Sequence, residues 1–338
     1  TDGTLFIGSM EGKLIATNTT DGSQLWAVSL ETSSSGGGFG CAATSRAVAI
    51  YGSPAVDGEL VYVGGYNGIV YAFAVGRDQP RWVYPRLGGN IGGSIIGGII
   101  VSQGKLYFGS ADGKVYALDA AEGYKEEGWP FEAGDKIWST PAISGDTLYI
   151  GSFDKKLYAL NITDGSKKWE FETEGAIAST PLVYNNTVYI GSFDRYLYAL
   201  DAADSHLRWK FMAENWFWAR PVVYNGTIYV ACLDGKVYGF NAESGDKLVE
   251  FDLGSPISSS PALVDDLLIV ATQEGIVYAL DTGNNEKRQL VALEEKVCAP
   301  LSASEGFVYI HTEEDALYAV DARSGAIREF DITFSEER

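Results

Sequence analysis

The side chains of this sequence best suited to recognise a ligand are three tryptophans and one arginine: Trp138, Trp216, Trp218 and Arg220. Two of these tryptophans stand three residues before a proline, Trp138 before Pro141 and Trp218 before Pro221. Aromatic rings near a guanidinium suit a planar or anionic ligand, or the centre of a peptide-binding surface. The alternative is that the tryptophans fill the space between repeated structural units as ordinary packing residues.

No pattern of catalytic or metal-binding residues is recognisable. The two histidines, His206 and His311, are isolated, so spacing indicates neither a zinc site nor a Ser/His/Asp triad. The three cysteines at positions 41, 232 and 298 are far apart, and their odd number leaves at least one thiol free or paired between chains. No acidic run has the spacing of a calcium loop. We therefore name no catalytic residue and expect no metal.

The composition narrows the classes of partner. The chain has 338 residues, of which 46% are hydrophobic, and a net charge of −20. Such an acidic surface repels phosphate backbones and anionic lipid, so we expect no nucleic-acid partner. No apolar run reaches the roughly 18 residues that a membrane-spanning helix needs. We expect membrane association only through an anchor on a segment that preceded Thr1 and was removed.

A repeat of about forty residues runs through the whole chain. The clearest copies are TLYIGSFDKKLYALNITDGSKKWEF at 147–171 and TVYIGSFDRYLYALDAADSHLRWKF at 187–211. One position of the repeat, glycine in the first five copies, occurs eight times: Gly8, Gly64, Gly109, Gly151, Gly191, Ala231, Ala271 and His311. The successive spacings are 56, 45 and 42 residues and then a constant 40, which is typical of a tandem array with early insertions.

Each copy contains four predicted strands. Apolar and polar residues alternate at 148–150 and 157–160, and β-branched and aromatic residues are frequent. Turn dipeptides such as Asp112-Gly113 separate the strands, and a proline-bearing strand opens the next copy. Four strands in about forty residues are typical of a propeller blade. We predict an all-β, monomeric, single domain over 1–338: an eight-bladed β-propeller of four-stranded antiparallel blades.

The first copy lacks the segment that would form its innermost strand. Pro141 lies ten residues before Gly151, whereas a position ten residues before Gly8 would precede the sequence. We therefore predict an incomplete first blade, and we expect the native protein to begin upstream of Thr1. The alternative is that residues 332–334 fold into the gap and cover the exposed strand edge.

Two glycine-rich segments interrupt the early repeats. Residues 31–50 include a Ser-Gly run that the fold does not require, so this insertion either engages a partner or is an unconstrained surface loop. The segment 88–93 lacks the helix and the lysine of a phosphate-binding loop. We expect it to be a connecting loop.

The repeat G-S-x-D-G-x-L-Y-A-L-D-A-x-x-G-x-x-x-W-x-F resembles the PQQ-like (pyrroloquinoline-quinone-type) propeller repeat. Residues 110–120 carry its first half, and Asp164-Gly165 with Trp169 and Phe171 carries its second half. In that family the tryptophan and glycine dock one blade on the next. The resemblance assigns this structural role to five tryptophans: Trp26, Trp82, Trp129, Trp169 and Trp209. The aligned residues of the last three copies are Val249, Gln289 and Glu329, so docking is expected to weaken there.

The resemblance also places the candidate ligand residues. The proline-bearing strand is innermost in this architecture, so Trp138, Trp216 and Trp218 should lie near one mouth of the central channel, with Arg220 beside them. Single-domain members of this length resemble BamB-like lipoproteins of the outer-membrane β-barrel assembly machinery, or uncharacterised surface and secreted PQQ-repeat proteins. They imply a non-enzymatic, extracytoplasmic scaffold that binds protein partners through its loops and channel mouth.

Two other functions stay open, a PQQ-dependent dehydrogenase-type enzyme and a glycan or small-ligand binding module. The quinone-dependent dehydrogenases of this superfamily are much longer and use a vicinal disulfide beside a calcium site. This sequence has no adjacent cysteines. We therefore do not expect PQQ as a cofactor, despite the name of the repeat.

Overall fold

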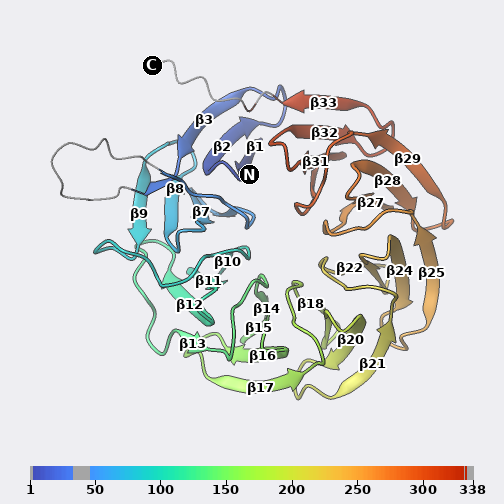
Figure 1. Ribbon diagram of the computed structural model, residues 1–338, viewed down its shortest axis with the longest axis horizontal. Helices are drawn as coiled ribbons and strands as arrows, with labels where there is room; N and C mark the ends of the chain where they lie inside the picture. The colour runs from blue at the N-terminus through green and yellow to red at the C-terminus, as the bar shows by residue number, and fades with distance from the viewer. Residues whose placement is uncertain (1–2, 33–45, 331, 333–338) are drawn as a thin grey trace.

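The computed structural model describes residues 3–32, 46–330 and 332. Eight antiparallel sheets stand as blades around a central channel, and each sheet is built from consecutive strands (Figure 1). The prediction of an all-β, eight-bladed propeller is confirmed. Most of the 31–50 insertion, including Cys41, lies outside the described residues. No helix in the described ranges is long and apolar enough to span a membrane.

In each of the first four blades the strands follow one another in sequence order from the channel outward, and successive blades run counterclockwise in Figure 1; the first blade has three strands. Blade 1 contains β1 (Thr4–Gly8), β2 (Lys13–Asn18) and β3 (Gln24–Ser29). A two-stranded ribbon of β4 (Glu31–Thr32) and β5 (Arg46–Ala47) follows it. Blade 2 contains β6 (Ala55–Asp57), β7 (Leu60–Gly64), β8 (Val70–Ala74) and β9 (Pro80–Tyr84). Blade 3 contains β10 (Ile100–Ser102), β11 (Lys105–Gly109), β12 (Lys114–Asp119) and β13 (Phe131–Glu132). Blade 4 contains β14 (Ala142–Ser144), β15 (Thr147–Gly151), β16 (Lys156–Asn161) and β17 (Lys167–Glu172).

The last four blades follow the regular 40-residue spacing. Blade 5 contains β18 (Leu182–Tyr184), β19 (Thr187–Gly191), β20 (Tyr196–Asp201) and β21 (Leu207–Met212). Blade 6 contains β22 (Val222–Tyr224), β23 (Thr227–Ala231), β24 (Lys236–Asn241) and β25 (Lys247–Asp252). Blade 7 contains β26 (Ala262–Val264), β27 (Leu267–Ala271), β28 (Ile276–Asp281) and β29 (Lys287–Ala292). Blade 8 contains β30 (Ser302–Ser304), β31 (Phe307–His311), β32 (Leu317–Asp321) and β33 (Ile327–Phe330).

The recurring glycine is the last residue of the second strand of its blade. This position requires glycine because a large side chain packs directly against the backbone there. A Cβ atom on Gly109 would lie 2.2 Å from Cγ2 of Ile137, and one on Gly151 would lie 2.1 Å from Cγ2 of Ile177. Both isoleucines are fully buried and come from the connection that leads to the next blade. The glycine slot therefore lets this connection close over the sheet.

Neighbouring blades are joined by paired hydrogen bonds to a single carbonyl group. In blade 2 the hydroxyl of Tyr62 and the indole Nε1 of Trp82 both donate to the carbonyl oxygen of Ala120 in blade 3, at 3.1 and 3.2 Å. Tyr149 and Trp169 donate in the same way to Ala202, at 3.0 Å each, and Tyr189 and Trp209 donate to Ala242, at 2.8 and 3.1 Å.

The other two tryptophans of the repeat occupy the same slot with different partners. Trp26 Nε1 donates to the carbonyl oxygen of Val75 in blade 2, at 2.9 Å. Trp129 is buried against Gly165 of blade 4, but its indole nitrogen has no hydrogen-bond partner among the described residues. The neighbouring Tyr107 hydroxyl still donates to the carbonyl oxygen of Ile162 in blade 4, at 3.1 Å.

The assignment of Gln289 and Glu329 to the tryptophan slot is wrong by one residue. The slot faces the alanine in the third strand of the blade, as Trp169 faces Ala159, and in the last two blades it holds Arg288 and Arg328. Blades 4 and 5 have a β-bulge before the tryptophan, whereas blade 7 has its bulge on the other side and blade 8 has none, so counting along the sequence shifts the position.

The two arginines still connect the blades. Arg288 Nη2 donates to the carbonyl oxygen of Arg323 in blade 8, at 2.6 Å, and Arg328 Nη1 donates to the carbonyl oxygen of Thr20 in blade 1. The ring is thus closed by a guanidinium in place of an indole.

The first blade has three strands, as predicted. Blade 1 packs on blade 8 through Phe330. A Cβ atom on Gly22 would lie 2.8 Å from Cδ1 of the Phe330 ring. Ile332 is buried in the same cluster as Ile7 and Ile15. Of the segment 332–334, which the alternative interpretation placed in the gap, only Ile332 is described; it is buried and belongs to no strand.

Blade docking predicts a difference between two glycines with the same backbone geometry. Gly123 has a φ of +70° and its Cβ atom would lie 2.5 Å from the ring of Trp82, whereas Gly104 has a φ of +74° and open space around it. Gly104→Ala should cost about 1 kcal/mol through backbone strain alone. Gly123→Ala should cost about 1–3 kcal/mol more, because the methyl group overpacks the docking contact. Thermal unfolding followed by circular dichroism measures both, and equal losses would contradict the docking role of Trp82.

Candidate functional site

Two kinds of loop meet at one mouth of the channel. The turn between the second and third strands of a blade receives the connection that leads into that blade's inner strand. The backbone N–H of Phe153 donates to the carbonyl of Lys136 at 3.0 Å, and the N–H of Leu233 donates to the carbonyl of Trp216 at 3.1 Å. The repeat therefore holds the side chains of the two loops next to each other at fixed positions.

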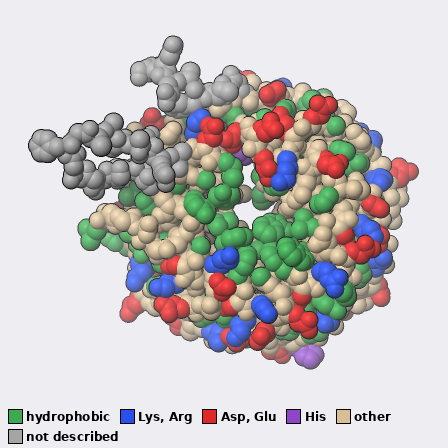
Figure 2. Space-filling view, in the orientation of Figure 1, with side chains coloured by type: hydrophobic (Ala, Val, Ile, Leu, Met, Phe, Trp, Pro, Cys, Tyr) green, Lys and Arg blue, Asp and Glu red, His purple; other side chains and the backbone are tan. Residues whose placement is uncertain are grey.

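Five aromatic side chains from blades 4, 5 and 6 form a continuous surface at this mouth, which we call the aromatic face: Trp138, Phe153, Phe193, Trp216 and Trp218. Figure 2 shows hydrophobic side chains gathered beside the central opening, over the region of β14, β18 and β22. Ring centroids are 4.5 Å apart for Trp138 and Phe153, and 5.9 Å apart for Phe153 and Phe193. Phe193 stacks with Trp216 at 4.6 Å and with Trp218 at 5.3 Å.

The three tryptophans of the aromatic face differ in how much of each side chain is exposed to solvent. Trp216 is 44% exposed, while Trp138 and Trp218 are half-buried. Each of the two half-buried rings packs against a phenylalanine, Trp138 on Phe153 and Trp218 on Phe193. Trp216 adds little to the core, because so much of it stays in water. A contiguous apolar surface of this kind, surrounded by polar residues, is typical of a binding site.

One cation, Lys136, lies on the aromatic face, and a second, Arg220, follows Trp218 two residues later in the chain. The ammonium group of Lys136 lies 4.5 Å from the ring centroid of Trp138 and 4.4 Å from that of Phe153, a cation–π arrangement on both rings. Arg220 is exposed, and its backbone N–H donates to Ser260 Oγ at 3.0 Å. Surrounding protein lowers the pKa of the Arg220 guanidinium from its ordinary value by desolvation. In the described ranges no carboxylate pairs with this guanidinium and no ring lies under it.

The structure thus brings together the three tryptophans that the sequence singled out, and adds Phe153 and Phe193 between them. Both phenylalanines occupy the position two residues after the recurring glycine, where the flanking copies have Ala111 and Leu233. The motif Gly-Ser-Phe-Asp in two adjacent copies was the available signal. This position varies among the copies, so the consensus of the repeat does not contain the signal.

The described residues do not offer the groups by which the quinone dehydrogenases of this repeat superfamily hold their cofactor. No group of three or more His, Cys, Asp or Glu side chains gathers there as a metal site. Cys232 and Cys298 are both free thiols, one buried and the other partly exposed. His311 contacts Asp315, with Nε2 to Oδ1 at 3.0 Å, and His206 lies in a turn of blade 5. We derive no catalytic step from these residues.

Comparisons with known proteins agree on one type of molecule. The profile of a family described as outer membrane protein assembly factor BamB matches residues 1–126 and 124–328. Among solved structures, BamB from Moraxella catarrhalis is similar with a TM-score of 0.75 and 17% identity, covering 94% of this chain and 93% of that one. No curated protein matches the sequence significantly.

Two other similar structures indicate how general the architecture is. The computationally designed Ika8 protein has a TM-score of 0.76 at 14% identity, covering 94% of this chain and 92% of its own. Sqt1 from Saccharomyces cerevisiae has a TM-score of 0.72 at 15% identity, covering 82% and 84%. At these identities the structural likeness concerns the fold alone.

Cys232 provides a test of how the aromatic face is anchored. Its sulfur lies 3.4 Å from the carbonyl oxygens of Asn215 and Trp216, and burial raises the pKa of this thiol to about 12. Near pH 8 only about one thiol in ten thousand would then be a thiolate, which is the reactive form. We expect iodoacetamide to modify Cys232 far more slowly than the half-buried Cys298, as measured by peptide mass spectrometry. Equal rates would show that the connection carrying Trp216 does not stay packed over Cys232.

Proposed function

Because this chain belongs to the PQQ-repeat family of outer membrane protein assembly factor BamB, we propose that it is a non-enzymatic scaffold that binds a protein partner at the aromatic face. The observation that carries the proposal is the stack of Phe193, Trp216 and Trp218 at an exposed mouth of the channel. Tryptophan is among the residues that contribute most to protein–protein affinity when a partner covers them.

The geometry of the aromatic face favours a protein partner because the site is preorganised. The connections that carry Trp138 and Trp216 are pinned by backbone hydrogen bonds to Phe153 and Leu233. Rings that are already stacked lose little conformational freedom on binding, so more of the contact energy appears as affinity. The partner's surface should be apolar at its centre, with acidic groups facing Lys136 and Arg220.

The family description supports a location outside the cytoplasm, whether periplasmic, at the cell surface or secreted. We propose that the chain acts there as a monomer and without PQQ, because the cysteine and acidic groups that hold the quinone in dehydrogenases have no counterpart among the described residues. The partner is held by the propeller surface, and no reaction is catalysed.

A glycan or small-ligand site is the second candidate, and one observation favours it. Stacked rings, with Arg220 two residues after Trp218 in the chain, would suit a sugar ring that carries an anionic group. Such a ligand would need Trp218 and Arg220 more than the most exposed ring, Trp216. The two candidates therefore differ in which substitution matters.

Photo-crosslinking tests the protein-binding proposal. A photoreactive amino acid at position 216 should crosslink a defined envelope protein in the native host, whereas the same group at position 248, an exposed leucine on blade 6, should not. With the purified partner, Trp216→Ala combined with Trp218→Ala should weaken binding at least tenfold. Leu248→Ala is the matched control and should change it less than twofold.

Three outcomes bear on the alternatives. Absence of a crosslink specific to position 216 would overturn protein binding at this face. Binding of an anionic oligosaccharide that depends on Arg220 would favour the glycan module. Turnover of alcohols or sugars with added quinone and calcium would identify an enzyme instead.

A further inference from the structure

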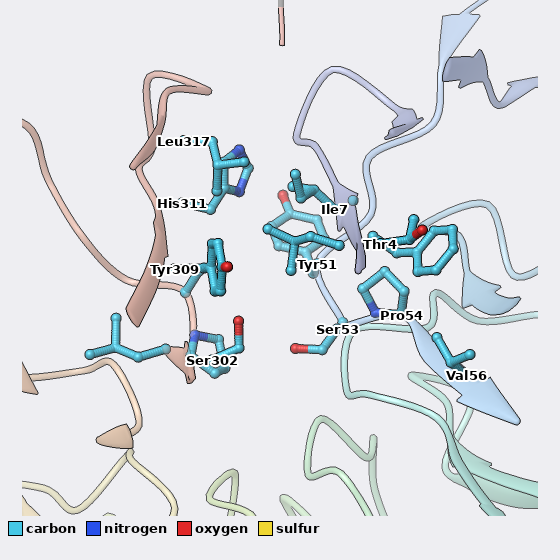
Figure 3. Close-up of a pocket in the computed structure, with 17 residues that line it drawn as sticks. Thr4, Ile7, Tyr51, Ser53, Pro54, Val56, Ser302, Tyr309, His311 and Leu317 are labelled. Atoms are coloured by element: carbon cyan, nitrogen blue, oxygen red, sulfur yellow. The ribbon is translucent and has the colours of Figure 1, made fainter. Parts of the chain in front are cut away.

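Cavities between blades differ in whether aromatic rings line them. One cavity of about 270 Å³ is bordered by blades 1 and 8, with Tyr51 and Tyr309 on opposite sides of it (Figure 3). Another of about 270 Å³ lies between blades 7 and 8, and no aromatic side chain is among the described residues that line it. We call it the blade 7 cavity. Its apolar wall is Leu267 and Ala279, and charged side chains, including Arg288, make up the rest.

The blade 7 cavity lies where the repeat loses both of its docking rings. In blade 5, Tyr189 of the second strand and Trp209 of the fourth strand flank Ala199 of the third strand. In blade 7 the two positions hold Ile269 and Arg288. Among the described strands, each of the other seven blades keeps an aromatic ring at one or both positions. The cavity therefore occupies the volume that a phenol and an indole would fill.

The backbone carbonyl that the two rings would bind is left with one long contact. Ala322 of blade 8 corresponds to Ala242 of blade 6, whose oxygen accepts hydrogen bonds of 2.8 and 3.1 Å from the rings of blade 5. Arg288 Nη2 is 3.5 Å from the oxygen of Ala322, and it bonds to the oxygen of Arg323 at 2.6 Å instead. Ala322 is fully buried, so its oxygen lacks a donor at the usual distance of about 2.9 Å.

The charged rim of the cavity distinguishes a small ligand from a protein partner. Glu286, Lys287 and Arg323 are exposed, and Arg323 pairs with Asp265 at 2.9 Å. A protein that covered this rim would remove all of these charges from water at a cost in free energy, whereas a small molecule can enter beside them. Arg288 adds a planar guanidinium, a group that stacks well on aromatic rings.

We propose that the blade 7 cavity binds a free, planar aromatic molecule whose ring N–H donates to the carbonyl oxygen of Ala322, as the indole of Trp209 does to Ala242. The ring takes the place of the missing side chains, packs against Ala279 and stacks on the guanidinium of Arg288. A cavity of roughly 150 Å³ can hold benzene. The blade 7 cavity, at about 270 Å³, has room for a two-ring molecule such as an indole.

This site is separate from the aromatic face and independent of the function proposed there. Leu267 is the first residue of β27 and pairs with Asp281, the last residue of β28. Both line the cavity, so it lies at the end of blade 7 opposite the turn between these strands. The aromatic face is built on that turn in other blades, where it carries Phe153 and Phe193.

Ligand-detected NMR titrations with indole and with benzofuran test the proposal. The two molecules have the same shape, but benzofuran has an oxygen atom in place of the N–H group. Indole should bind saturably at one site, and benzofuran should bind at least fivefold more weakly, because it leaves the oxygen of Ala322 without a donor. No saturable binding of indole, or equal binding of the two molecules, would overturn the proposal.

Substitutions that restore the rings of the repeat should close the site. Ile269→Tyr combined with Arg288→Trp recreates the pair found in blade 5, and it should abolish indole binding while raising the melting temperature. If this double variant does not fold, Ala279→Leu fills the cavity from the third strand and should weaken binding at least tenfold. Leu248→Ala, at an exposed position on blade 6, is the matched control. Unchanged indole binding by a folded, cavity-filled variant would overturn the proposal.

Trp209→Ala is the positive control, because it empties the equivalent space between blades 5 and 6 and removes one donor from Ala242. This variant should bind two molecules of indole where the unaltered chain binds one. Indole binding by Trp209→Ala together with none by the unaltered chain would overturn the proposal. The variant with Trp216→Ala and Trp218→Ala should bind indole normally, and loss of binding there would place the indole on the aromatic face instead.

Discussion

A single backbone carbonyl that accepts two side-chain hydrogen bonds from the previous blade is the contact on which this propeller depends. Ala202 and Ala242 each receive a tyrosine hydroxyl and a tryptophan indole. The carbonyl directly follows a strand of one blade, and the two donors come from two different strands of the preceding blade. The two hydrogen bonds together therefore fix both the distance and the rotation between the blades. A buried carbonyl left without these donors would cost free energy, so the contact also excludes other blade orientations.

The aromatic face follows from this regular spacing. Equivalent loops of successive blades come to lie side by side, so an unusual residue repeated in two or three adjacent copies becomes a continuous surface. Phe153 and Phe193 are 40 residues apart in the sequence, yet their rings are 5.9 Å apart. A ring of similar modules can in this way acquire a site by changing a few loop residues, while the buried residues of the repeat stay as they are.

The sequence predicted those features that repeat, and it failed where the copies differ. The recurrence of the glycine slot was sufficient for the number of blades, because the slot records a packing contact with a large buried side chain, and the distance from the proline to the slot was sufficient for the three-stranded first blade. The tryptophan slot of the last two blades was misassigned, since a β-bulge changes position without any change in repeat length. The location of Trp138, Trp216 and Trp218 could be predicted, but the bridging role of Phe193 depends on distances between blades that only the folded ring supplies.

Blades 1 and 8 meet although they come from opposite ends of the described chain, and this has a consequence for how the protein folds. Every strand pair in the described part of the chain joins neighbours in sequence, so each blade can form from a short continuous stretch as it leaves the ribosome. The contact between Arg328 and Thr20 instead spans 308 residues of chain. Assembly can therefore proceed by local steps, blade upon blade, and the long-range meeting of blades 1 and 8 follows once blade 8 has formed.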